Sequence, residues 1–315
     1  MPASYRSGHA RLASPPSRIV QRLANSHATI DLAPNDAITF QHTVLCQTSL
    51  PYRNPGDQVR TWEQRNGGAL IKIHAGEAAD PRTKAVIPLG LPYGPKPRLI
   101  LAYLNREALR TGSPVIDVGR NLSTFLQRLG LDTHGRNLSC IKTQIARLSA
   151  AHITLGIFAS DTKAITIHTQ IVSAFDLWYS IDSPRLLWPT QVQLSREYFE
   201  SLTHHAVPLD ERAIAALSHS AMALDLYAWL AQRLHRIAPT QPLEVSWEAL
   251  KAQFGWHYQE RFKFRQVFLH TLQTVLSQYR DAIIEVGQNG LQLFQSPPPV
   301  KGRVAIVNPS FPIQP

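Results

Sequence analysis

Two stretches of the sequence combine basic and amide side chains with an absence of carboxylates, a pattern that suits contact with DNA. Residues 133–160 contain three Lys or Arg residues and no acid, and residues 261–280 contain four and no acid. In a chain with 22 acidic residues such gaps are informative, because a carboxylate that faces phosphates lowers affinity for DNA. Since Arg and Lys pair with guanine and Gln with adenine, these stretches predict recognition of base edges and phosphates.

The first stretch has the period of an amphipathic helix over residues 136–151. At 100° per residue, Leu138, Ile141, Ile145 and Leu148 fall on one stripe, which we expect to be buried. The polar side chains opposite this stripe or flanking it are the candidate DNA contacts: Arg136, Ser139, Lys142, Thr143, Gln144 and Arg147. Lys142 lies to one side, where we expect it to reach a phosphate. The helix is therefore a candidate for the major groove.

The second stretch predicts a similar helix over residues 261–279. Its apolar stripe consists of Phe264, Phe268, Leu272 and Val275. The side chains on the far side of the helix or beside it are again candidate DNA contacts: Arg261, Lys263, Arg265, Gln266, His270, Gln273 and Thr274. Each well-placed base contact of this kind contributes about 1–3 kcal/mol of discrimination, so a few of them suffice for sequence-specific binding.

The two helices occupy the same place in a repeated order of predicted elements: helix, short strand, helix, turn, helix and hairpin. The first block comprises residues 98–110, 115–118, 122–129, 136–151 and a hairpin of 153–158 with 164–170. The second comprises residues 211–236, 243–245, 247–254, 261–279 and a hairpin of 282–286 with 290–294. This order is typical of a winged helix, a helix-turn-helix followed by a small sheet. The hairpin tips near Lys163 and near Gln288–Asn289 are expected to touch the DNA backbone or minor groove.

We therefore predict an α+β, helix-rich fold of two tandem winged-helix domains with an extra β-containing segment on the N-terminal side. The expected divisions follow in chain order: a disordered or partly helical tail over 1–37, a first domain over 38–172, a second, DNA-binding domain over 173–296, and a Pro-rich tail over 297–315. Residues 38–90, or the strand near Val115, could pair two chains into a homodimer.

Composition narrows the partners and the compartment. The chain has 315 residues, 32 Lys and Arg against 22 Asp and Glu, a formal charge of +10 and a pI near 9.9. A protein this basic is expected to bind an anionic partner, and double-stranded DNA is the first candidate. Cys46 and Cys140 form neither a disulfide framework nor a Cys-rich zinc site, which fits a reducing cytosol. The sequence has no membrane-length apolar run, and no secretory signal over Met1–Leu12, so we expect no membrane partner and a cytoplasmic location.

Catalytic patterns are missing from the sequence. No GxxxxGK[ST] loop, HExxH zinc spacing or GxSxG elbow occurs. His204 and His205 are adjacent rather than separated by one apolar residue, as the metal pair of a DNA-nicking protein would be. Asp210 and Glu211 open a helix, where the helix dipole favours negative charge. We therefore expect no enzymatic activity, no metal and no cofactor.

Two strings of residues resemble a known family. Residues 46–57 (CQTSLPYRNPGD) and 91–116 (LPYGPKPRLILAYLNREALRTGSPVI), with 125–130 (FLQRLG) after them, are similar to RepA-type plasmid replication initiators. The similarity runs from about residue 38 to about 295. It implies tandem winged helices, binding to direct repeats (iterons) at a plasmid origin, and local opening of the duplex. It also implies recruitment of the host initiator and replicative helicase, with a switch between monomer and dimer.

These expectations combine into one hypothesis with two alternatives. Each domain would place one helix in the major groove on the same face of DNA, about one turn (10–10.5 bp) apart, so one chain would cover about 20 bp. The first alternative is a winged-helix transcriptional repressor that does not open DNA. The second is a rolling-circle nicking initiator, which the missing histidine pair disfavours.

Overall fold

A computed structural model describes residues 37–79, 83–131, 135–160, 163–174 and 191–300 of the chain. Up to residue 174 the elements are β1 (Ile38–His42), α2 (Thr43–Gln47), β2 (Thr61–Asn66), β3 (Ala69–His74), β4 (Glu77–Ala79), β5 (Val86–Pro88), α3 (Pro95–Thr111), β6 (Val115–Asp117), α4 (Leu122–Arg128), α5 (Gly135–Ala150), β7 (His152–Ser160), β8 (Lys163–Thr169) and β9 (Val172–Ala174). From residue 191 they are β10 (Gln191–Leu194), α6 (Arg196–His205), β11 (Ala206–Asp210), α7 (Glu211–Leu217), α8 (Ala221–Arg233), a 3-10 turn (Leu234–Arg236), β12 (Leu243–Ser246), α9 (Trp247–Phe254), α10 (Arg261–Leu276), β13 (Ile284–Val286) and β14 (Gly290–Leu293).

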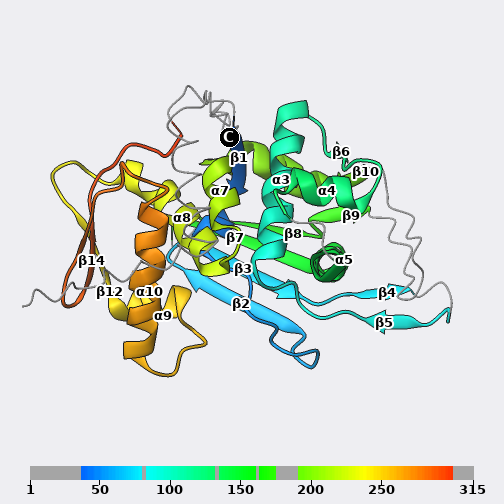
Figure 1. Cartoon of the computed structure of the whole chain (residues 1–315), viewed down its shortest axis with the longest axis horizontal. Helices are drawn as coiled ribbons and strands as arrows, with labels where there is room; N and C mark the ends of the chain where they lie inside the picture. Colours follow the sequence, from blue (N-terminus) through cyan, green and yellow to red (C-terminus); the bar gives the residue numbers. More distant parts are fainter. Residues whose placement is uncertain (1–36, 80–82, 132–134, 161–162, 175–190, 301–315) are drawn as a thin grey trace, which may run out of the picture.

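The expected α+β, helix-rich fold is confirmed, and both blocks show the predicted order of helices, short strand and hairpin (Figure 1). Local signals set several boundaries as expected. Prolines occupy the first turn of α3, and Gly112 ends that helix in the left-handed conformation at φ 64°. The tails predicted over 1–37 and 297–315 lie almost entirely outside the described residues.

The second block has the sheet of a winged helix. Strand β12, which follows the long helix α8, pairs with β14, and β14 pairs with β13, all antiparallel. The strand order is therefore β12-β14-β13, with the last strand in the middle. One expectation is wrong here: residues 211–236 form α7, α8 and a 3-10 turn rather than one helix. Ser220 caps α8 by accepting a hydrogen bond from the Ala223 N–H, which starts a new helix at that point.

In the first block, the hairpin pairs with strands from the N-terminal segment rather than with the strand that follows α3. Hairpin β7–β8 extends the N-terminal hairpin β2–β3 into a four-stranded antiparallel sheet of order β2-β3-β7-β8. Along β3 and β7, Ile71 lies opposite Leu155 and Ile73 opposite Ile153, and all four side chains are buried. The strand after α3, β6, pairs instead with β10. The predicted N-terminal β segment is thus half of the sheet that carries the first wing.

The halves of the chain on either side of residue 172 interlock. Strand β1 pairs with β11 from Ile38 opposite Asp210 to His42 opposite Ala206, and β10 lies between β6 and β9. Helix α8 lies in the middle, and every residue from Ala221 to Gln232 is buried. A helix that is buried on all sides must be covered by neighbours, which here include α2, α3 and α10.

A buried ion pair joins α3 to α8. Arg98 donates from Nε and Nη2 to the two carboxylate oxygens of Asp225, at 2.6 and 2.8 Å. Its remaining donors reach the carbonyl oxygens of Gly94 and Leu50, each at 2.7 Å. The Tyr52 ring lies 5.2 Å from the guanidinium carbon. One arginine therefore links three segments of the chain in the core.

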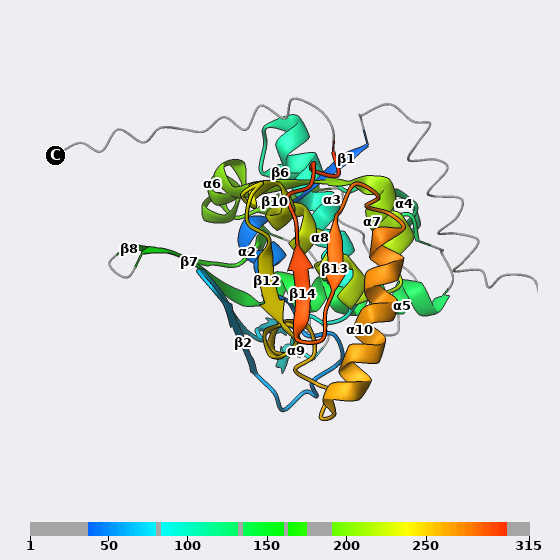
Figure 2. The same cartoon turned by 90° about the vertical axis from the view of Figure 1, so that its left-hand side faces the viewer.

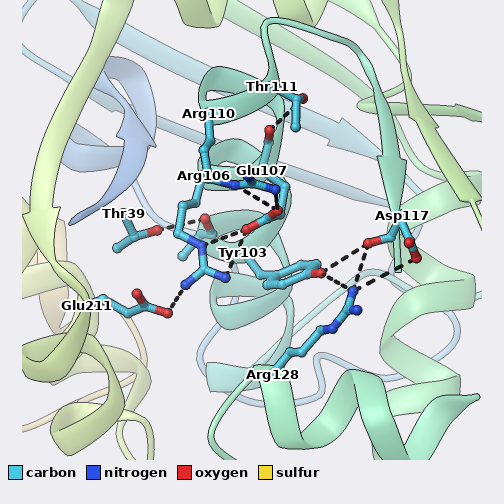
Figure 3. A network of polar contacts seen from close by, with 10 residues as sticks. Thr39, Tyr103, Arg106, Glu107, Arg110, Thr111, Asp117, Arg128 and Glu211 are labelled. Carbon is cyan, nitrogen blue, oxygen red and sulfur yellow. Dashed lines mark hydrogen bonds and ion pairs between the residues drawn. The ribbon is translucent and has the colours of Figure 1, made fainter. Parts of the chain in front are cut away.

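Tyr103 on α3 is the centre of a second polar network, shown in Figure 3. Its hydroxyl accepts a hydrogen bond from Arg128 of α4 at 3.0 Å and donates to the Asp117 carbonyl oxygen of β6 at 3.2 Å. One turn further along α3, Arg106 pairs with Glu211 of α7. These contacts fix α4 and α7 on opposite sides of α3.

Candidate nucleic-acid interface

The turn between α9 and α10 is rigid because a glycine lets an aromatic ring lie against it. A Cβ at Gly255 would lie 2.3 Å from Phe264 Cδ2, so only glycine leaves room for that ring. The Tyr258 N–H donates to the Gly255 carbonyl at 2.8 Å, and the Tyr258 ring packs on Phe264, with centroids 5.9 Å apart. Together α9, this turn and α10 form a helix-turn-helix whose last helix has a defined start.

Helix α10 buries the stripe that its sequence predicts. Phe264, Phe268, Leu272 and Val275 are all at most 2 % exposed. Phe268 contacts Phe254 of α9, with ring centroids 5.7 Å apart. This packing fixes the rotation of the helix about its axis, and so decides which side chains point outward.

Most of the predicted contact residues of α10 do point outward. Arg261, Lys263, Gln266, His270 and Gln273 are exposed, whereas Arg265 and Thr274 are half-buried. Figure 2 shows α10 on the right-hand side of the molecule, next to β13, with no other helix in front of it. The exposed face thus combines cations with amide and imidazole groups that can hydrogen-bond to base edges.

Arg265 flanks the exposed face and also contacts the hairpin β13–β14, which is the wing of the second block. Its guanidinium carbon lies 4.7 Å from the centre of the Trp247 ring, and Nη2 donates to the Gly287 carbonyl at 3.5 Å. The Trp247 indole N–H in turn donates to the Gln288 carbonyl at 3.0 Å. The tip between β13 and β14 is therefore tied to α9 and α10, as a wing that contacts DNA together with the helix would need.

The cations at the start of α10 are paired only weakly. Arg261 lies 2.9 Å from Glu248, and Lys263 lies 3.0 Å from Glu260. All four side chains are more than 60 % exposed, and such pairs contribute only about 0–1 kcal/mol. Phosphates can therefore replace these carboxylates at little cost.

Helix α5 confirms its predicted apolar stripe but not all of its predicted contacts. Ile141, Ile145 and Leu148 are buried, and Leu138 is half-buried. The expectation for Gln144 is wrong: its side chain is 1 % exposed, and its Oε1 accepts a hydrogen bond from the Tyr93 N–H at 2.8 Å. The segment before α3 covers this side of α5. A helical wheel is drawn from the residues of one helix, so it cannot predict a covering segment from elsewhere in the chain.

The outward orientation predicted for Arg147 is also wrong. Its side chain is 12 % exposed and its guanidinium stacks over the Tyr93 ring at 5.2 Å. It donates to the Leu91 carbonyl at 3.2 Å and to the Asp57 carboxylate at 3.1 Å. Since its donors already have protein partners, Arg147 holds two loops against α5 rather than facing DNA.

What remains exposed on α5 is its N-terminal part. Ser139 and Thr143 are exposed and Lys142 is half-buried, while the side chains of Arg136 and Lys163 lie outside the described residues. Figure 1 shows α5 nearly end-on, whereas α10 lies in the plane of the view, so the two helices are not parallel. In Figure 1, α10 lies at the left of the molecule and α5 to the right of its centre, with other elements between them.

A hollow beside the Tyr103 network is charge-balanced. A cavity of about 580 Å³ there is lined by three arginines and three carboxylates: Arg106, Arg110, Arg128, Glu107, Asp117 and Glu211. Each arginine pairs with one of these acids: Arg106 with Glu211, Arg110 with Glu107 at 2.7 Å, and Arg128 with Asp117 at 3.9 Å. A cavity with so little net charge favours neither an anion nor a cation.

No group of three or more His, Cys, Asp or Glu side chains is placed to hold a metal ion in the part of the chain that the structure describes. Over the same residues, no helix is long and apolar enough to cross a membrane.

One residue of the exposed α10 face, Phe262, is absent from the contacts that the sequence predicts. Phe262 is 76 % exposed and lies between Arg261 and Lys263. Because phenylalanine is apolar, its residue type alone predicts a buried position, even inside a basic stretch. Its position relative to the buried stripe of α10 was the signal that could have identified it.

Comparison with known proteins gives one strong match. The family model described as plasmid encoded RepA protein matches residues 91–249, which run from before α3 into α9 and stop short of α10. No curated protein matches the chain significantly.

Solved structures give only distant likenesses. A crystal structure of domains 2 and 3 of RctB, from selenomethionine derivatives, has 12 % identity and a TM-score of 0.46, over 74 % of this chain and 84 % of that one. A second structure of RctB domains 2–3 has 11 % identity and a TM-score of 0.46, over 76 % of this chain and 83 % of that one. Likenesses at this level carry no argument about function.

Proposed function

The chain belongs to the family of plasmid-encoded RepA proteins, and on that premise we propose that it initiates plasmid replication by binding repeated sequences (iterons) at the origin. The observation that supports this most is the α9–α10 helix-turn-helix with its attached wing. Its exposed face carries Lys263, Gln266, His270 and Gln273. In the proposal, α10 enters the major groove, and the Gln288–Asn289 tip touches the adjacent backbone or minor groove.

The two blocks have unequal roles in this proposal. Helix α10 reads base edges, whereas α5 contacts the backbone through Lys142 and its exposed N-terminal turns, because Gln144 and Arg147 are occupied within the protein. Bound copies on adjacent repeats then strain the duplex, and a nearby A·T-rich segment opens. The host initiator and replicative helicase are recruited to the opened segment, and the chain itself catalyses no covalent step.

Footprinting on the plasmid's own origin tests the unequal roles. We expect α10 to give strong major-groove protection of one segment per repeat. About one helical turn away, we expect α5 to protect only the DNA backbone and not the bases. Base protection of equal strength in both segments would contradict the assignment. Permanganate reactivity of thymines beside the bound repeats separates an initiator from a repressor of the same fold, because only the initiator opens DNA.

Substitutions on α10 provide a quantitative check. Gln266→Ala and His270→Ala are each expected to weaken specific binding about 5- to 150-fold, with much less effect on nonspecific binding, because a base contact contributes about 1–3 kcal/mol. Lys142→Ala should weaken both kinds of binding alike and reduce the salt slope by about 1. Fluorescence anisotropy over a range of salt concentrations measures all three effects.

Arg196→Ala is the matched control for the loss of charge in Lys142→Ala. Arg196 is 84 % exposed on α6, which lies on the side of the molecule away from α10 in Figure 2. Its removal takes away one positive charge without touching the proposed interface, so binding should stay close to wild type. If Arg196→Ala weakened binding as much as Lys142→Ala, general charge rather than a contact of Lys142 would be responsible.

A further inference from the structure

Phe262 is an aromatic residue whose side chain is exposed to solvent in the first turn of α10. At 76 % exposed, it is the most exposed large hydrophobic residue among those that the structure describes. It lies in the first turn of α10, and it is not among the side chains that pack against the core. Neither stability nor packing within the chain accounts for an aromatic ring here.

The position of Phe262 on the helix is well defined. At 100° per residue it lies about 40° from Gln266 and about 20° from Gln273, on the half of the helix that faces away from the buried stripe. The neighbouring residue Phe264 is 1 % exposed and packs against Gly255 and Tyr258, so the first turn cannot rotate. Phe262 therefore lies within the row of side chains proposed to read bases.

The surroundings of Phe262 fit DNA better than a protein partner. An apolar protein interface would need a contiguous patch of several hundred square ångströms, rimmed by polar groups. Phe262 is instead flanked by Arg261 and Lys263, whose exposed cations complement phosphates. In the major groove, the apolar group available to an aromatic ring is the 5-methyl group of thymine.

We propose that Phe262 is a specificity-determining residue that packs on the 5-methyl group of a thymine in the DNA site. This inference rests on the proposed function and extends it from polar contacts to one apolar contact. It predicts that the preferred site contains a thymine next to the bases that Gln266 contacts. The contact supplies selectivity for thymine over every base that lacks the methyl group.

Deoxyuridine provides a direct test, because it differs from thymidine only by this methyl group. Sites are first selected from a random-sequence duplex library with the wild-type protein. Each thymine of the selected duplex is then replaced singly with deoxyuridine. Wild type should lose about fourfold in affinity at one thymine, as expected for burying one carbon group. Phe262→Ala should show a similar loss on the unmodified duplex and no further loss with deoxyuridine at that position.

Two further variants make the outcome decisive. Phe262→Leu keeps an apolar contact and should retain part of the sensitivity to deoxyuridine, whereas Phe262→Gln should lose it. Because the ring is exposed, circular dichroism and thermal unfolding should be unchanged in all three variants. The inference is overturned if Phe262→Ala remains as sensitive to deoxyuridine as wild type. It is also overturned if this variant selects and binds the same DNA as wild type but fails to support replication, which would indicate a protein partner.

The same experiment separates this inference from the proposed function. If the wild-type protein selects no sequence from the library, specific binding itself fails. If His270→Ala changes the selected sequence and Phe262→Ala does not, α10 reads DNA and only the role of Phe262 is wrong.

Discussion

Asp225→Ala is expected to lower the free energy of unfolding by about 3–5 kcal/mol, because it leaves the Arg98 guanidinium charged and without its carboxylate in the core. The Arg98 and Asp225 side chains are 4 % and 10 % exposed, so water cannot replace the lost partner. Chemical denaturation monitored by circular dichroism measures the change. Since Arg98 also binds the Leu50 and Gly94 carbonyls, the loss should loosen the N-terminal segment and α3 together.

A double variant separates the cost of an unpaired charge from the contribution of the pair itself. Arg98→Met with Asp225→Leu removes both charges and keeps similar volumes, so its stability should lie close to wild type. The exposed pair Arg196–Glu200 is the matched control, because Glu200→Ala should change stability by less than about 1 kcal/mol. A single variant Asp225→Ala as stable as wild type would mean that the pair does not hold α3 against α8.

The second large effect is a loss of stability in acid that depends on His42. Its Nδ1 accepts a hydrogen bond from the Val44 N–H at 3.2 Å, so its Nε2–H donates to Ser201 at 2.9 Å and the ring is neutral. Burial, together with the nearby His205 ring, lowers the pKa of His42 to about 3 from the usual 6.5. Between these values the unfolded chain binds a proton that the folded chain does not. This one group should therefore reduce stability by up to about 1.4 kcal/mol for each pH unit below about 6.5.

His42→Asn isolates this contribution. The asparagine amide oxygen can still accept from the Val44 N–H, and asparagine does not titrate. We expect a lower free energy of unfolding at pH 7 and a shallower decline between pH 6.5 and pH 4. His168→Asn, at an exposed position on β8, is the control for the same replacement outside the core. Equal slopes for wild type and His42→Asn would contradict the assignment.

Local periodicity predicted α10 and its surroundings well. The stripe from Phe264 to Val275 and the exposure of Gln266 and His270 follow from the 3.6-residue repeat, because one face of this helix meets the core and the other meets solvent. The resemblance to RepA-type initiators was also confirmed, over residues 91–249. The DNA contacts themselves, the domain divisions and the absence of enzymatic activity stay predictions.

Contacts between distant segments account for what the sequence could not predict. Gln144 and Arg147 have the right periodicity for an exposed face, but Asp57, Leu91 and Tyr93 come from loops 50 to 90 positions earlier and cover them. The pairing of β7 with β3, and of β6 with β10, likewise joins segments about 80 residues apart. Such pairings depend on the folded chain as a whole, and no window of adjacent residues contains them.

The register of the second wing has a consequence for how DNA preference could change. Leu243 of β12 lies directly opposite Leu293 of β14, so the chain enters and leaves the region of α9, α10 and the wing at neighbouring points. A region with adjacent entry and exit can be exchanged as a unit, provided that it keeps the side chains that pack on α8. In the proposed function, such an exchange across some fifty codons would change the DNA preference of the protein without altering the rest of the chain.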